Sequence, residues 1–335
     1  MGCCCALLWF LLDHWLALSV GAAVAFKMWY KSSVGMCDSS RRLDGLTALI
    51  TGANAGIGLE TAKDLARRGA RVLMACRDPQ RGQKALEVVR AAARGDATVE
   101  LLSLDLASLD SVRACAAKVL ASEPRLDILI NNAGAGLGGL GSDQTADGLH
   151  RGLQSNHFGP FLFTLLLVDL LKKSAPARIV FVSSGAHEMG KLTPERLEYS
   201  TAKDFGDMQI YSMTKLGNVL VSNELARRLK GTGVTVNSLH PGVVLTDIYR
   251  FIPGWIREPV KVLLLLFFKN AEEGAQTTIH LAVSEEVEGV TGRYFSDCKE
   301  ARMSEAASNV GLARTIWEKS EQLVKLRDNE RPSFG

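Results

Sequence analysis

The chain has 335 residues, of which 47% are hydrophobic, and a formal net charge of +3. That length allows one large α/β domain or two small ones, with a sizeable core in either case. The charge is mild and forms no basic stripe with interleaved aromatic residues, so no nucleic-acid partner is expected. The seven cysteines are an odd number without paired spacing, which argues against a disulfide framework and fits a reducing compartment. No Cys/His spacing suggests a zinc site, and we predict no metal.

The first segment of the chain differs in kind from the rest. Residues 3–30 are almost wholly apolar, broken only by an Asp-His pair and one lysine, and they are long enough to span a bilayer. Basic residues follow, so the positive-inside rule puts the remainder of the chain in the cytosol. We predict a lipid-bilayer anchor over residues 1–30 and a basic linker over residues 31–43. A cleaved signal peptide, an interfacial hairpin and palmitoylation of the first cysteines stay open as alternatives.

From residue 44 onward, short apolar runs alternate with helical stretches. Continuous apolar runs, rather than period-two alternation, indicate a parallel sheet covered on both faces, and the connections fit right-handed helical crossovers. We therefore predict a single doubly wound, Rossmann-type α/β domain over residues 44–326 with helices on both faces. A polar, disordered tail is expected over residues 327–335. The strands are predicted at 47–51, 71–75, 99–104, 126–130, 178–182 and 234–239, and the helices at 59–68, 79–94, 109–121 (with Ser108 as N-cap), 145–173 and 209–229.

Residues 252–270 depart from this alternation, because they contain two prolines, a glycine and the apolar run 262–268. That run is too short to span a membrane. It predicts a lid or an amphipathic segment that packs on substrate or touches lipid. A plain core helix explains the run equally well.

The first strand leads into a glycine-rich turn at residues 51–58, and a helix follows. Strand, turn and helix in this order place a pyrophosphate on free backbone N–H groups at the helix N-terminus. One glycine permits the tight turn, one lets the phosphate approach the backbone, and one lets the helix pack on the strand. By itself the turn is a weak signal, because many βα turns are rich in glycine.

Tyr211 and Lys215 lie four residues apart in one predicted helix, so they share a face. A cation beside the phenol stabilises its ionised form, which a general acid/base must reach. The preceding strand leads into Ser183, at the carboxyl edge where ligands bind in open α/β sheets. This placement predicts proton-transfer chemistry beside a nucleotide site.

Further landmarks accompany the glycine turn and the Tyr/Lys pair. In chain order, the set is residues 51–58, 75–77, 131–134 and 155–161, Ser183, Tyr211 with Lys215, and residues 240–246. With these landmarks the chain resembles the short-chain dehydrogenase/reductase family, and within it the membrane-anchored retinol dehydrogenase subfamily. The subfamily resemblance also rests on the N-terminal anchor and on the long insertion between Ser183 and Tyr211.

The resemblance implies a role for each matching catalytic position. Tyr211 would pass a proton to or from the substrate oxygen, and Lys215 would support it and hold the nicotinamide ribose. Ser183 would hydrogen-bond the same substrate oxygen. Asn156 would complete a proton relay through water.

The resemblance also implies a dinucleotide cofactor. Asp105 would meet the adenine amine, and Thr246 would hold the carboxamide. Asn132, Ala133 and Gly134 would steady the adenosine side and the central strand. The other cofactor-binding positions that we predict are Gly52, Asn54, Gly56, Ile57, Gly58, Leu106, Tyr211, Lys215, Pro241, Gly242 and Val244.

Arg77 favours NADP(H) over NAD(H). An enzyme that prefers NAD usually has an acidic residue near the end of the second strand, where it binds the ribose 2′-hydroxyl. This chain has Cys76 and then Arg77, whose guanidinium offers a charge-assisted fork for a 2′-phosphate. Asp78 is interpreted as the N-cap of the next helix. Asn54, on the glycine turn, is predicted as a second contact to the phosphate.

Together these features predict an NADP(H)-dependent oxidoreductase acting on a hydrophobic alcohol and its aldehyde or ketone. The resemblance implies retinol and retinal. A steroid or lipid-derived carbonyl is the alternative, and a non-catalytic membrane-tethered binding protein is a third hypothesis. The family also implies the endoplasmic reticulum membrane, with mitochondria as the alternative, and leaves open a homodimer that pairs through the helices at 145–173 and 209–229.

Overall fold

The computed structural model describes the chain from residue 34 to residue 334 except for residues 95–96, 137 and 245–267. It also describes isolated residues of the preceding segment: His14, Trp15, Leu18, residues 21–22 and 25–28, and Tyr30.

Eight strands of the described chain form one sheet in the order β3-β2-β1-β4-β5-β6-β7-β8. All neighbours are parallel except β8, which pairs antiparallel with β7. This confirms the predicted Rossmann-like parallel sheet, and each predicted strand is present with its ends shifted by two residues at most. The strands are β1 (Thr47–Thr51), β2 (Arg71–Cys76), β3 (Val99–Ser103), β4 (Ile128–Asn131), β5 (Ala177–Val182), β6 (Val234–His240), β7 (Tyr294–Ser296) and β8 (Lys299–Glu300).

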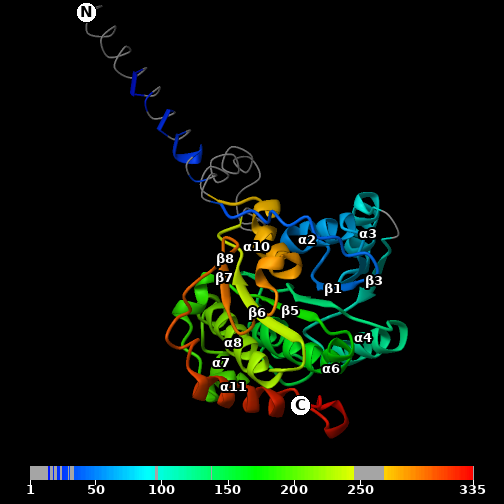
Figure 1. Cartoon of the computed structure of the whole chain (residues 1–335). Coiled ribbons are helices and arrows are strands. Elements are labelled where there is room, and N and C mark those ends of the chain that lie inside the picture. Colours follow the sequence, from blue (N-terminus) through cyan, green and yellow to red (C-terminus); the bar gives the residue numbers. More distant parts are fainter. Residues whose placement is uncertain are drawn as a thin grey trace, which may run out of the picture.

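Helices cover both faces of the sheet (Figure 1). One face carries α2 (Gly56–Arg67), α3 (Pro79–Ala92) and α10 (Ala271–Val283), and the other carries α4 (Leu109–Ser122), α6 (Gly159–Lys173), α8 (Asp207–Arg228) and α11 (Val310–Leu323). The shorter elements are α5 (Arg151–Leu153), a π-helical turn (Gln154–Phe158), α7 (Tyr199–Ala202) and 3₁₀ turns at Gly185–Met189, Glu195–Leu197, Glu285–Val287 and Asp328–Glu330.

The central strands are buried on both sides, as their continuous apolar runs predict. Every residue of β1 is buried. Leu49 belongs to the core under α4, α6 and α8, whereas Ala48 and Ile50 belong to the core under α2 and α10. Successive side chains of a strand point to opposite faces, so one five-residue strand contributes to two cores.

The predicted helix at 145–173 is wrong at its start. Gln144 pairs with His150 in an antiparallel bridge, and the N–H of Thr145 donates to the carbonyl of Leu149. Gly148, between them, has a φ of +85°, a left-handed conformation that interrupts a helix. The segment is therefore a small hairpin, and helical structure begins only at Arg151.

Two helices and two strands near the C-terminus were not predicted. Helix α10 begins with a capping box formed by Asn270 and Glu273, and α11 is capped by Asn309. Both caps are readable sequence signals. The strands β7 and β8 are too short to give a clear apolar run.

The prediction of a disordered tail is also wrong for residues 327–334. Glu330 forms an ion pair with Arg113 of α4 at 2.6 Å. The ring of Phe334 packs edge-on against Trp317 of α11, with centroids 5.9 Å apart. A polar composition suggested disorder, but contacts of Glu330, Arg331, Ser333 and Phe334 tie the segment to α4, α6 and α11.

Among the described residues, none of the helices has both the length and the apolar character needed to cross a bilayer. Most of the anchor predicted over residues 1–30 lies outside the described residues, as do residues 252–267 of the predicted lid.

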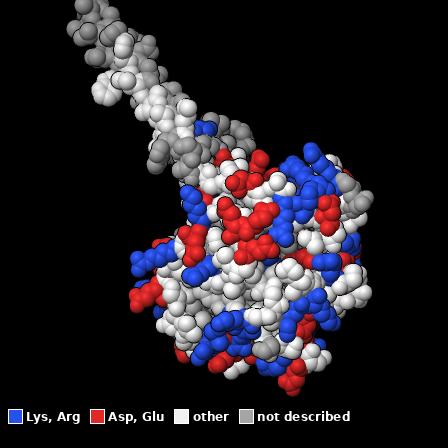
Figure 2. Space-filling model, in the orientation of Figure 1, with Lys and Arg blue, Asp and Glu red and all other residues white. Residues whose placement is uncertain are grey.

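The described residues that precede β1 run along α10 (Figure 1), where the N–H of Cys37 donates to Gln276. Basic and acidic side chains lie interspersed on the face shown in Figure 2.

Candidate active site

The glycine turn after β1 is built on close backbone contacts. Gly52 has a φ of +69°, and an added Cβ would lie 2.9 Å from the Cα of Ala133. A Cβ on Gly58 would overlap the carbonyl oxygen of Gly52 and the side-chain nitrogen of Asn132. Glycine is needed at both positions, once for the left-handed turn and once for the approach of α2 to the turn.

Asn132 fastens this turn to the neighbouring strand. Its Nδ2 donates to the carbonyl of Thr51 at 2.9 Å, while the hydroxyl of Thr51 accepts the N–H groups of Asn132 and Ala133, both at 3.0 Å. The ends of β1 and β4 are thereby joined side by side. This geometry agrees with the steadying role that the resemblance implies for Asn132.

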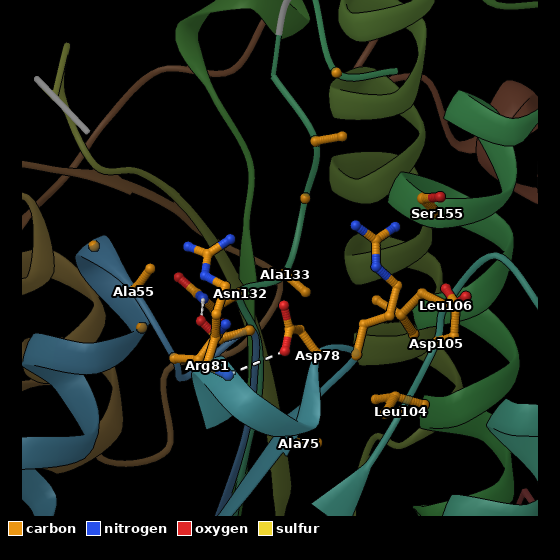
Figure 3. A pocket seen from close by; sticks show the side chains of 18 of the residues that line it. Ala55, Ala75, Asp78, Arg81, Leu104, Asp105, Leu106, Asn132, Ala133 and Ser155 are labelled. Atoms are coloured by element: carbon orange, nitrogen blue, oxygen red, sulfur yellow. Dashed lines mark hydrogen bonds between the residues drawn. The ribbon is translucent and has the colours of Figure 1, made fainter. Parts of the chain in front are cut away.

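A cavity of about 710 Å³ opens at the carboxyl ends of β1 to β4. Figure 3 shows Arg81 on one side of it and Asp105, Leu106 and Ser155 on the other. The predicted cofactor residues that line the cavity are Gly52, Asn54, Gly56, Ile57, Gly58, Arg77, Asp105, Leu106, Asn132, Ala133 and Gly134.

The cavity suits a dinucleotide. Helix α2 begins at its wall, and the N-cap residue Ala55 offers no side-chain hydrogen bond to the first turn. The N–H groups of that turn can therefore bind a phosphate, which the positive end of the helix favours. The cradle formed by Gly52 and Gly58 would be filled by any larger residue.

Two arginines stand at the end of the cavity formed by β2 and α3. Arg77 follows β2 and is exposed, and Arg81 lies in the first turn of α3. Asp78 caps α3 by accepting the N–H groups of Gln80 and Arg81 at 2.9 and 3.0 Å, which confirms its predicted role. Burial raises the pKa of Cys76 to about 11, so this position carries a neutral thiol.

The sequence analysis missed several lining residues: Ala55, Ala75, Asp78, Arg81, Leu104, Ala135, Gly139, Arg151, Ser155 and Ala271. Arg81 could have been found, because it lies four residues after Arg77 at the start of a predicted helix. Ser155 precedes the predicted Asn156 directly. Arg151 gives no such local signal.

The predicted catalytic residues Ser183, directly after β5, and Tyr211 and Lys215, on α8, meet at the same edge of the sheet. The ammonium of Lys215 lies 5.6 Å from the ring centroid of Tyr211 and donates to the carbonyl of Val182 at 3.0 Å. Ser183 donates its hydroxyl to the backbone carbonyl of Lys215 at 2.8 Å. The hydroxyl of Ser183 must therefore rotate before it can donate to a substrate oxygen.

Asn156 lies in the π-helical turn between α5 and α6, a distortion that is frequent at functional sites. Its Oδ1 accepts the N–H of Ala135 at 2.7 Å and its Nδ2 donates to the carbonyl of the same residue at 2.8 Å. A Cβ on Gly134 would lie 3.4 Å from the ammonium of Lys215 and 3.6 Å from Oδ1 of Asn156. Gly134 thus lies both in the lining of the cavity and beside the predicted catalytic residues.

The loop after β6 contains three more predicted cofactor residues, Pro241, Gly242 and Val244. These three do not line the cavity. Val244 pairs with Lys269 in a parallel bridge. A Cβ added to Gly274 of α10 would contact the side chains of both Val244 and Ile57. Thr246 lies outside the described residues.

A partly buried histidine ends β6 beside this loop. Burial, with a smaller effect of the Lys269 ammonium, lowers the pKa of His240 to about 4, so its imidazole is neutral near pH 7. A Cβ on Gly185 would lie 3.5 Å from its Nε2. Within the part of the chain that the structure describes, no group of His, Cys, Asp or Glu side chains is arranged to hold a metal ion.

Comparison with known families and proteins gives one consistent result. Residues 46–255 match the family described as short chain dehydrogenase. The chain is 47% identical to retinol dehydrogenase 14 of Mus musculus over 295 residues, which cover 84% of this chain and 86% of that protein. It is 43% identical to dehydrogenase/reductase SDR family member 13 of Homo sapiens over 295 residues, which cover 88% and 77%.

Solved structures agree on the fold. An uncharacterised protein from Mycobacterium paratuberculosis is 30% identical, with a TM-score of 0.67 over 87% of this chain and 98% of that chain. L-sorbose reductase from Gluconobacter frateurii, solved with NADPH and L-sorbose, has a TM-score of 0.63 at 21% identity over 77% and 96%. The chain therefore belongs to the short-chain dehydrogenase/reductase family of NAD(P)-dependent oxidoreductases.

Proposed function

We propose that this protein is an NADP(H)-dependent oxidoreductase that interconverts a hydrophobic alcohol and its aldehyde or ketone, with Tyr211 as general acid/base. One observation carries the proposal: Tyr211, Lys215 and Ser183 meet at the sheet edge where Gly134 lines a dinucleotide-sized cavity. The nicotinamide cofactor, when bound, supplies or accepts the hydride.

The chain's own residues handle the proton. During reduction, the phenol of Tyr211 donates its proton to the substrate oxygen as negative charge develops there. The buried ammonium of Lys215, held by the carbonyl of Val182, stabilises the phenolate that remains. Ser183, after its hydroxyl rotates, donates a hydrogen bond to the same oxygen. Asn156 holds the backbone of Ala135 and is proposed to carry the water that returns the proton.

Arg77 and Arg81 support the choice of NADP(H). Both guanidiniums border the end of the cavity where β2 and α3 meet, and arginine binds phosphate through paired N–H groups. The neutral thiol of Cys76 replaces the carboxylate that an NAD-preferring site would present. Asn54 lies on the same part of the wall as a second polar contact.

Retinol and retinal are the proposed substrates, because relatives at 43–47% identity are named retinol dehydrogenases. A steroid or lipid-derived carbonyl is the second candidate. We further propose a membrane anchor over residues 1–30, a basic linker over 31–43 and a catalytic domain over 44–326 in the cytosol at the endoplasmic reticulum. A homodimer through α6 and α8 stays a prediction; α11 of the same chain already packs on both helices, through Arg228 and Phe161.

The test compares purified full-length protein with its Tyr211→Phe variant, using NADPH and a panel of retinal, steroid ketones and medium-chain aldehydes. Tyr211→Phe should abolish turnover, because it removes the group proposed to exchange the proton, while NADPH still binds. Tyr199→Phe, a tyrosine of α7 outside the site, is the matched control and should keep wild-type kcat/KM. Retained turnover in Tyr211→Phe would refute the mechanism, and the panel ranks the substrate classes.

A further inference from the structure

Arg151 lines the cavity but belongs to none of the groups described so far. It starts α5, next to Ser155 in the lining and on the wall that also contains Asp105 and Leu106. The resemblance and the catalytic arrangement assign it no role. Its position is at the end of the cavity formed by β3 and α4, away from Tyr211.

The side chain of Arg151 is held in one orientation by Asp143. Its Nε donates to both carboxylate oxygens at 2.9 Å, and its Nη2 donates to Oδ2 at 2.5 Å. The backbone N–H of Arg151 also donates to the carbonyl of Asp143, at 3.0 Å. Gly141 leaves room for the pair, since a Cβ there would lie 2.8 Å from the Asp143 carboxylate and 2.9 Å from Cδ of Arg151.

The hairpin that carries this pair is itself fixed to the wall of the cavity. The carboxylate of Asp147 accepts the side chain of Gln154 at 2.5 Å and the N–H of Leu109 at 2.9 Å. Leu109 begins α4, only a few residues after Asp105. Arg151 is therefore tied to the same end of the sheet as the residue expected to meet the adenine amine.

The ion pair uses only part of the guanidinium. Asp143 accepts the N–H of Nε and an N–H of Nη2, so this edge is not available to a phosphate. Asp143 does not engage the N–H groups of Nη1 or the flat faces, and a guanidinium face stacks well on an aromatic ring. The buried side chain of Leu106 adds apolar surface to the same wall.

We propose that Arg151, oriented by Asp143, stacks on the adenine of NADP(H) and is a binding residue for that base. The proposal rests on the proposed function, because it needs a dinucleotide in the cavity. The arginines of the site then have separate roles, since Arg77 and Arg81 bind the 2′-phosphate and Arg151 binds the base.

Equilibrium binding of two ligands without nicotinamide tests this division independently of turnover. The probes are 2′,5′-ADP and 5′-AMP, which share the adenine and differ in the 2′-phosphate. Binding to the full-length protein is measured by calorimetry, with 5′-AMP in competition if it binds weakly. Arg151→Ala should raise the Kd of both ligands by the same factor, about five- to tenfold. Arg77→Ala should raise only the Kd of 2′,5′-ADP.

Any other outcome of these binding measurements contradicts either the stacking proposal or the proposed function. If Arg151→Ala weakens 2′,5′-ADP alone, Arg151 binds phosphate and the stacking proposal is wrong; if it weakens neither ligand, Arg151 plays no part in binding. If the wild-type protein binds neither ligand, the proposed NADP(H) function fails instead.

Two further variants guard against a merely structural effect. Arg293→Ala removes an arginine from an exposed ion pair with Glu300, outside the cavity, and should leave both Kd values unchanged. Arg151→Lys keeps a charge for Asp143 but has no plane, so it should bind both ligands about two- to threefold more weakly. Wild-type affinity of folded Arg151→Lys for both ligands would overturn stacking even if Arg151→Ala does not fold.

Discussion

At the scale of single residues, hydrogen bonds decide which charged side chains near the cavity are already engaged by the protein and which can bind a ligand. Asp78 lies between Arg77 and Arg81 in the chain, yet its carboxylate is used by the N–H groups that begin α3. The two guanidiniums thus remain available to an anion. Asp78 keeps its negative charge, but its hydrogen bonds hold Oδ1 on the backbone of α3.

Arg77→Ala should therefore raise the KM for NADPH about tenfold or more, because a charge-assisted hydrogen bond of about 1.5–3 kcal/mol is lost. The KM for NADH should change little, since NADH has no 2′-phosphate. Initial rates with both cofactors on the same aldehyde measure the difference. Equal losses with NADPH and NADH would contradict the assignment of Arg77.

The absence of a side chain at Gly58 allows α2 to lie close to the glycine turn at the wall of the cavity. Gly58→Ala would push α2 away from the glycine turn, because its Cβ would overlap Gly52 and Asn132. We expect a loss of about 1–3 kcal/mol in stability together with weaker NADPH binding. Gly206→Ala, whose Cβ would meet nothing within 4 Å, is the control. Thermal unfolding measures the loss of stability, and titration with NADPH measures the loss of binding. Equal results for Gly58→Ala and Gly206→Ala would show that the overlap has no effect.

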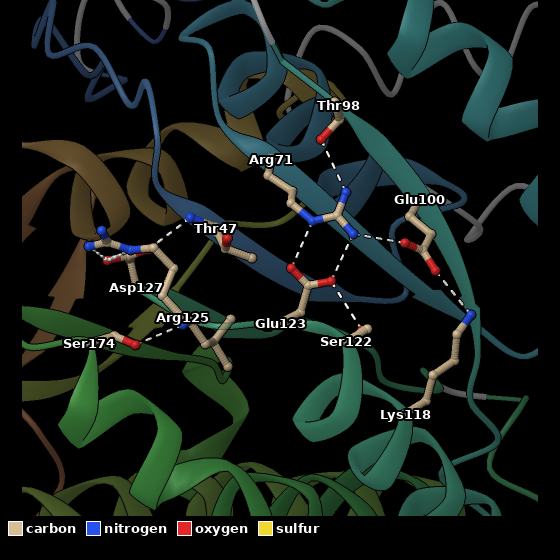
Figure 4. Close-up of polar contacts among 11 residues, drawn as sticks. Thr47, Arg71, Thr98, Glu100, Lys118, Ser122, Glu123, Arg125, Asp127 and Ser174 are labelled. Atoms are coloured by element: carbon tan, nitrogen blue, oxygen red, sulfur yellow. Dashed lines mark hydrogen bonds and ion pairs between the residues drawn. The ribbon is translucent and has the colours of Figure 1, made fainter.

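At the scale of elements, ion pairs and hydrogen bonds connect the strands at the end of the sheet opposite the site (Figure 4). Arg71 at the start of β2 binds the carboxylate of Glu123 at the end of α4 with two hydrogen bonds of 2.7 Å. It also binds Glu100 of β3 at 2.8 Å. Next to this group, Asp127 accepts the N–H of Thr47 at 2.8 Å. These contacts align β1, β2 and β3 and so fix where their carboxyl ends form the site.

Arg71→Met should destabilise the protein by about 1–3 kcal/mol, because the side chain of Glu123 is only 1% exposed and would be left unpaired. The double variant Arg71→Met/Glu123→Gln should recover part of that loss. Arg293→Ala, in an exposed pair, should cost less than about 1 kcal/mol. The midpoint of urea unfolding measures all three. A double variant less stable than Arg71→Met would argue against a buried unpaired charge as the cause.

At the scale of the whole molecule, the C-terminal helix α11 packs against α6 and α8 and completes the core on that face of the sheet. Trp317 of α11 is fully buried and packs against Phe161 of α6, with ring centroids 5.0 Å apart. The ring of His157, in the π-helical turn, lies 2.9 Å from the hydroxyl of Ser320 on α11. The residue after Asn156, for which we propose a catalytic role, therefore depends on a helix far away in the chain.

This arrangement predicts acid sensitivity. Burial lowers the pKa of His157 to about 4, whereas an unfolded histidine titrates near 6.5. Between these values the unfolded chain binds more protons, so stability falls as the pH falls below about 6.5, by about 2 kcal/mol at pH 5 for this residue. Urea unfolding at pH 7.5 and pH 5 measures the loss. His157→Gln should reduce the pH dependence; an unchanged dependence would assign it to other groups.

Local patterns in the sequence determine a large part of this molecule. The apolar runs predict β1, β2, β4, β5 and β6 because these strands face a core on both sides, and they also predict β3, which lies at the edge of the sheet and is only partly buried. The glycine turn between β1 and α2 and the four-residue spacing of Tyr211 and Lys215 each lie within a short continuous stretch of the chain, so neighbours in the sequence suffice to recognise them.

Only the tertiary structure brings Arg81, Arg151 and Ser155 to one cavity with Asp105, and it alone reveals that Asn156 holds Ala135 and that Glu330 docks on Arg113. These contacts join elements that are distant in sequence, and their partners carry no shared periodicity. The start of the helix at Arg151 was missed for the same reason, since a hairpin closed by Gln144 and His150 replaces the expected turns. The order of the strands brings the parts of the site together, and side-chain packing between the elements decides which residues face it.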